Sequence, residues 1–129
     1  MREGQAVHAR DLMLSFKGRI NRRRYWIAIL CVVAAAFVVA VIVAPMPKAI
    51  GQAVALIAAV ALLYPLTAIA VKRFHDRGKA GWWALIGFVP VVGSLWLIVE
   101  NGFLAGTKGP NRYGPDPLQR SSRVLRPRR

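Results

Sequence analysis

The residues most able to do chemistry lie in one short stretch, V-K-R-F-H-D-R-G-K-A-G-W-W, from Val71 to Trp83. It contains a His75–Asp76 pair, and a histidine beside a carboxylate is suited to general acid–base catalysis. No nucleophile and no second acid lie nearby in the sequence, so the pair lacks the partners that a catalytic site needs. We therefore expect Asp76 to be a structural counter-ion that reaches back to Lys72 or Arg73. A His–Asp proton relay is the alternative.

Long apolar segments flank this charged stretch on both sides. Asp, Glu, Lys and Arg are absent from residues 25–47, 49–71 and 81–99, although the 129-residue chain carries a formal net charge of +14 and is 56% hydrophobic. Soluble proteins intersperse charge so that each surface helix stays amphipathic. Such strict separation of charged from apolar residues indicates an integral membrane protein and argues against a small soluble domain.

We predict an all-α integral membrane protein with about three transmembrane helices, at residues 25–44, 50–71 and 82–103. Twenty helical residues cover roughly 30 Å, the thickness of the hydrocarbon core. Small residues in the second segment predict that the first two helices pack closely as a hairpin. Pro90 and Gly93 interrupt the third segment, which is either one kinked helix that crosses or two half-helices that enter and return.

The distribution of cations near the segment ends predicts the orientation. Residues 17–24 hold five cations and the loop from Lys72 to Lys79 holds four, against one in the 45–49 turn and two, Lys108 and Arg112, soon after the third segment. Three crossings with a cytoplasmic amino terminus satisfy this asymmetry and place the carboxyl tail outside. A third segment that returns to its starting side places the tail inside instead.

The chain divides into a polar leader (1–14), one membrane domain (15–117) and a basic tail (118–129) that we expect to be disordered. In the central loop, Gly78 and Gly81 let the backbone turn, and Trp82 and Trp83 stand where aromatic rings anchor helices at the headgroup level. With His75 and Asp76 they form a candidate structural cluster.

The predicted function is binding of lipid headgroups or of partner proteins through a basic cytoplasmic face. Such a face would attract anionic lipid by about 1 kcal/mol per cation; the alternative is that the cations only orient the chain during insertion. The candidate binding residues are Arg22, Arg23, Arg24, Lys72, Arg73 and Arg77.

Other classes of function find less support in the sequence. An oligomeric channel or transporter subunit built around the Pro90–Gly93 break is the main alternative, and a lipid-modifying enzyme centred on His75 is a third. We expect no enzyme activity and no cofactor, and no metal site, because His8, Cys31 and His75 are far apart. The partners expected are anionic membrane lipids and a second copy or another membrane protein, and not nucleic acid, because the cations lie beside the apolar segments.

Three blocks together resemble a known family. They are F-K-G-R-I-N-R-R-R-Y-W (16–26), V-K-R-F-H-D-R-G-K-A-G-W-W followed by I-G-F-V-P-V-V-G (71–93), and G-P-N-R-Y-G-P-D-P (109–117). The pattern is similar to that of the bacterial inner-membrane proteins grouped as domain-of-unknown-function family 805. Lys72 and Phe74 stand where the family usually has Arg and Leu. The resemblance implies a multi-pass inner-membrane protein of a few helices, and it brings no established activity or site residues.

If Asp76 is a counter-ion, Asp76→Asn should lower the thermal stability of the protein in detergent, because it leaves four loop cations without a neutralising acid. His75→Ala should lower it less. Thermal unfolding of both purified variants measures this. Full stability of both, with loss of a cellular phenotype, would instead favour the proton relay.

Overall fold

The computed structural model describes residues 9–119, and the regular elements in this range are helical, as the sequence predicts. The predicted all-α class is therefore confirmed for these residues. The elements are α1 (Ala9–Leu14), α2 (Arg22–Val43), α3 (Lys48–Asp76), η1 (Gly81–Phe88), α4 (Val92–Leu97) and η2 (Ile98–Phe103). Most of the leader and of the basic tail, residues 1–8 and 120–129, lies outside the described residues.

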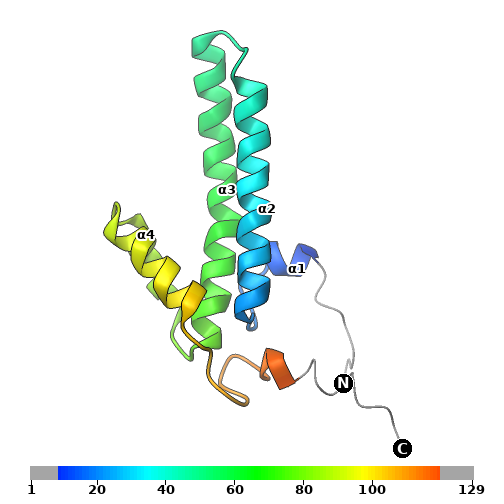
Figure 1. Cartoon of the computed structure of the whole chain (residues 1–129), viewed down its shortest axis with the longest axis vertical. Helices are drawn as coiled ribbons and strands as arrows, with labels where there is room; N and C mark the ends of the chain where they lie inside the picture. The colour runs from blue at the N-terminus through cyan, green and yellow to red at the C-terminus, as the bar shows by residue number, and fades with distance from the viewer. Residues whose placement is uncertain (1–8, 120–129) are drawn as a thin grey trace, which may run out of the picture.

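Helices α2 and α3 run antiparallel, side by side, and dominate the structure (Figure 1). Asn21 caps α2, as its side-chain oxygen accepts a hydrogen bond of 2.9 Å from the Arg24 amide. At 22 and 29 residues the helices are roughly 33 Å and 43 Å long. Both are long and apolar enough to cross a membrane. Helix α3 continues five residues beyond its predicted end at Val71, and so carries the charged stretch into the helix.

The two long helices pack tightly at one end and expose apolar side chains over the rest. Ala28 of α2 and Ala68 of α3 are fully buried, and these small residues let the helices approach closely. Elsewhere Leu30, Phe37 and Ile57 each expose more than 60% of their surface. A continuous apolar exterior of this size suits a lipid environment and not water.

Helix α3 ends in a Schellman motif, which turns the chain sharply. The Lys79 amide donates to the Phe74 carbonyl at 2.9 Å, and the Gly78 amide donates to the His75 carbonyl at 3.0 Å. Gly78 has a φ of 73°, a conformation that costs glycine little because it lacks a Cβ atom. Gly81 has another role, since a Cβ atom there would lie 2.7 Å from Val71 Cγ1.

Residues 81–103, which we call the fold-back segment, differ from the predicted third transmembrane helix. The chain runs out along the 3-10 helix η1, reverses at Val89–Val91 and returns through α4 and the π-helical η2. The outgoing arm, η1, and the returning arm, α4 with η2, are in close contact. A Cβ atom on Gly93 would overlap the Ile86 carbonyl. The outgoing arm of eight residues reaches roughly 16 Å, about half of the hydrocarbon thickness.

The fold-back segment returns the chain to the end from which it left. Glu100 forms ion pairs with Arg77 and Lys79, which precede the segment. Arg19, which precedes α2, donates hydrogen bonds to the Gly109 and Thr107 carbonyls. Of the two alternatives for residues 82–103, the structure therefore shows the return. It does not confirm the single crossing, with the following chain on the opposite side, that the cation count favours. The break at Pro90–Gly93 is a reversal, and residues 104–119 lie at the same end as residues 19–22.

This arrangement predicts a labelling pattern in a variant whose Cys31 is replaced. Single cysteines at Lys17 and Lys108 should react from the same side of the membrane, and a cysteine at Lys48 from the opposite side. Membrane-impermeant maleimide applied to cells before and after permeabilisation measures this. If Lys108→Cys reacts together with Lys48→Cys, residues 81–103 cross the membrane and the fold-back is incorrect.

Candidate functional site

The carboxylate of Asp76, at the last turn of α3, lies between two buried arginines. Arg19 Nε and Nη2 both lie 3.0 Å from Asp76 Oδ1, and Arg73 Nη1 forms an ion pair with Asp76 Oδ2. All three residues are less than 10% exposed. A buried ion pair is stable only when its remaining hydrogen-bonding groups are also satisfied, so the other contacts of both arginines matter.

The remaining donors of these arginines go to backbone carbonyls from distant parts of the chain. Arg19 Nη1 donates to Gly109 at 2.7 Å and Nη2 donates to Thr107 at 2.6 Å. Arg73 Nε donates to Asn101 at 2.6 Å, and its Nη2 donates to Leu104. The guanidinium groups therefore fasten η2 and the loop after it onto the end of α3.

The backbone of Asp76 also holds that loop. The Thr107 amide and hydroxyl each donate to the Asp76 carbonyl at 2.8 Å. A Cβ atom on Gly106 would overlap the Asp76 carboxylate, so this position needs the smallest residue. Sequence reasoning counted Arg19 only as one of five orienting cations and gave Gly106 and Thr107 no role.

Lys72 and Arg73 do not belong to an exposed basic face, which corrects their place among the candidate lipid-binding residues. They are 2% and 0% exposed, respectively. The Lys72 ammonium donates to the carbonyls of Asp11 and Leu12 at the end of α1, and so makes no ion pair with Asp76. Their positions on α3 turn both side chains inward, where they hold neighbouring backbone.

Glu100 brings a second acid to the charged stretch, although it is distant in the sequence. Its Oε1 lies 3.0 Å from Arg77 Nε and also pairs with Lys79. The Lys79 ammonium stands over the Trp83 ring, 5.5 Å from its centroid, and Trp83 stacks on Trp82 at 4.8 Å. Arg77 is thus engaged in an internal pair and is only partly exposed. Asp76 is not the only acid that neutralises this loop.

His75 and Asp76 point to different partners. The His75 ring stacks on Tyr113 with centroids 3.8 Å apart and planes 7° apart, and its Nδ1 lies 3.2 Å from the Gly18 carbonyl. The Asn111 side chain donates to the His75 carbonyl at 2.9 Å. Because the Asp76 carboxylate faces arginines, the structure does not bring the two side chains together as a relay requires.

Asp116 stabilises the same loop through backbone contacts. Its carboxylate accepts hydrogen bonds of 2.9 Å from the amides of Leu118 and Gly109. These bonds, with that to Leu118 the largest cause, lower the pKa of Asp116 below its ordinary value of 3.8. A lowered folded-state pKa means that this stabilisation is present at neutral pH and is lost only as the pH falls below about 3.8.

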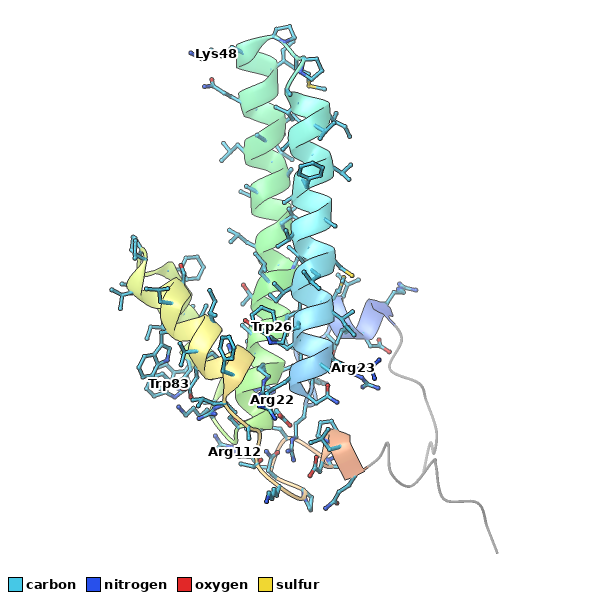
Figure 2. All side chains as sticks on the ribbon, viewed as in Figure 1. Arg22, Arg23, Trp26, Lys48, Trp83 and Arg112 are labelled. Carbon is cyan, nitrogen blue, oxygen red and sulfur yellow. The ribbon has the colours of Figure 1, made fainter. Side chains whose placement is uncertain are left out.

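The remaining cations of this end lie at or near its surface, and one buried side chain is unsatisfied. Arg22 and Arg23 are exposed at the start of α2, and Arg112 is exposed on the loop after η2 (Figure 2). Arg24 is half-buried, and Lys17 and Lys108 are also exposed. Asn101 is fully buried, yet its side-chain oxygen and nitrogen have no hydrogen-bond partner in the described part of the chain.

Two apolar helices of membrane-spanning length, joined at one end to a compact charged cluster, define a small all-helical membrane protein. Residues 13–115 match the model of a protein family of unknown function, DUF805. The chain belongs to this family.

The curated relatives agree with a membrane location. The chain is 36% identical to the inner membrane protein YhaH of Escherichia coli K12 over 107 residues, covering 81% of this chain and 88% of the relative. It is 34% identical to the inner membrane protein YhaI of the same strain over 105 residues, covering 81% and 86%. The uncharacterized protein YiiR of this strain is 31% identical, covering 81% and 86%. No solved structure matches.

The contact between Gly106 and Asp76 predicts that Gly106→Ala will destabilise the protein by about 3 kcal/mol, because it separates a buried carboxylate from its arginines. Gly87→Ala is the matched control, since a Cβ atom there meets only the tip of the Leu97 side chain, at 2.6 Å. Thermal unfolding in detergent compares the two. Equal melting temperatures would show that the loop is not fastened to Asp76.

Proposed function

We propose that the protein is a membrane module that binds anionic lipid headgroups through the exposed cations at its charged end. The observation that carries the proposal is the distribution of the acids. Of the four carboxylates in the described residues, Asp76, Glu100 and Asp116 are buried in internal contacts, and Asp11 is exposed. The surface of this end is therefore left with an excess of positive charge.

The cations available to lipid differ from the set that the sequence suggested. Arg22, Arg23 and Arg24 remain candidates, while Lys72 and Arg73 are internal and Arg77 pairs with Glu100. Further exposed cations come from other segments of the same end: they are Lys17, Lys108 and Arg112. An anionic membrane surface attracts each such cation by about 1 kcal/mol.

The same distribution supports a cytoplasmic charged end. Lys48 is the one cation between residues 25 and 71, and it lies at the opposite end of the two long helices (Figure 2). Loops rich in Lys and Arg remain in the cytoplasm. We infer that the amino-terminal segment, the 77–80 turn and the 104–119 loop all face the cytoplasm of a bacterial inner membrane.

A channel or transporter subunit has less support. The break in the third segment was its expected lining, but Gly93 is buried against the other arm of the fold-back segment. Carriers of ions place charged side chains within their spans, and residues 25–47 and 49–71 have no Asp, Glu, Lys or Arg. We likewise propose that the protein is not an enzyme, because His75 and Asp76 serve separate structural contacts.

Lipid composition around the purified protein tests the proposed function. In nanodiscs that contain phosphatidylglycerol and phosphatidylethanolamine, the wild type should concentrate the anionic lipid, and high salt should reduce the enrichment. Replacing Lys17, Arg23 and Arg112 together by Gln should lower the enrichment several-fold. The enrichment is measured by mass spectrometry of the co-purified lipids.

The control is Lys48→Gln, which removes a cation from the opposite end and should leave most of the enrichment. Equal amounts of both lipids around the wild type, unchanged by salt or by the triple substitution, would show that the cations act only in orienting the chain.

A further inference from the structure

One face of α2 changes from cationic to aromatic to aliphatic along its length. Arg22, Trp26 and Leu30 are spaced four residues apart, and Val33 follows three residues later, so all four share a face. The distance from Arg22 to Val33 along the helix is roughly 16 Å, similar to the hydrocarbon depth of one leaflet. This order matches that of a phospholipid lying parallel to the helix.

The first two positions are held in place by the end of the fold-back segment. Arg22 Nη1 donates to the Phe103 carbonyl at 3.0 Å, and the Trp26 indole donates to the Gly102 carbonyl at 3.1 Å. The Trp26 and Phe103 rings meet edge to face, 5.9 Å apart. A Cβ atom on Gly102 would lie 2.6 Å from the Trp26 ring, so the glycine allows this close contact.

Beyond Trp26, the fold-back segment does not cover this face of α2. Leu30 and Val33 are 64% and 57% exposed. Residues 102–103 meet α2 at its lower end, whereas α4 packs chiefly against η1 and η2. Figure 2 shows Trp26 and Arg22 on the side of α2 that faces the fold-back segment.

We propose that this face binds one anionic phospholipid, with its phosphate on Arg22 and an acyl chain along Trp26, Leu30 and Val33. Arg22 donates one hydrogen bond to the Phe103 carbonyl and forms no ion pair in the described residues. The other N–H groups of its guanidinium can therefore bind a phosphodiester. Charge complementarity and the adjoining apolar surface therefore favour a lipid over a second copy of this chain. The proposal deepens the proposed function, because it turns a general attraction into one defined site.

Native mass spectrometry of the full-length protein tests this site. The protein is released from mixed phosphatidylglycerol and phosphatidylethanolamine at a salt concentration that removes loosely associated lipid. We expect one retained phosphatidylglycerol per chain. Arg22→Gln should reduce its occupancy about tenfold, and Arg23→Gln, the adjacent exposed arginine with the same change of charge, should leave it within about twofold.

Leu30→Ser is a second variant that leaves the internal packing intact, because Leu30 is exposed. It should weaken retention of long-chain phosphatidylglycerol and leave binding of the dihexanoyl form unchanged. Equal losses in Arg22→Gln and Arg23→Gln would overturn the single site and leave the general attraction standing. A wild type that retains no phosphatidylglycerol, or that forms a lipid-free dimer, would also overturn it.

Discussion

The structure depends on one buried carboxylate shared by two buried arginines. Without Asp76, Arg19 and Arg73 would be positive charges in a poorly solvated place, and removing one partner of such a group costs about 3–5 kcal/mol. With it, the two guanidinium groups become rigid donors for carbonyls of η2 and of the loop at residues 104–109. One ion cluster thus joins three stretches that are far apart in the sequence: the residues before α2, the end of α3, and the chain from η2 to residue 109.

The small number of acidic side chains also determines the charge of the protein surface. The chain has five acidic and 19 basic side chains, and three of the acids are buried, so few carboxylates remain to neutralise the exposed cations. Glu100 forms ion pairs with both Arg77 and Lys79, and Asp116 accepts hydrogen bonds from backbone amides of its loop. Internal stability and a basic surface therefore come from one arrangement, and the exposed cations are those that pair with no acid in the described residues.

The sequence predicts the features that depend on local pattern. Charge-free segments predict the two long helices, and Pro90 with Gly93 predicts a break. It does not predict contacts that depend on which distant segments meet. Arg19 reaches the end of α3 because α2 and α3 lie side by side. Gly106 and Glu100 reach it because the fold-back segment reverses, and counting cations near segment ends cannot distinguish a reversal from a crossing. The burial of Lys72 and Arg73 follows from the unpredicted extension of α3 past Val71.

The reversal of the fold-back segment has a consequence for how the protein is made. If α2 and α3 alone cross the bilayer and the charged end is cytoplasmic, as we propose, the polar part of residues 9–119 that must pass through it is the short turn around Pro45 and Pro47, together with Lys48. Moving a turn with one charge across the bilayer costs little free energy when the two helices insert together. The ion cluster can then form without any of its charged members leaving the compartment in which the chain is synthesised.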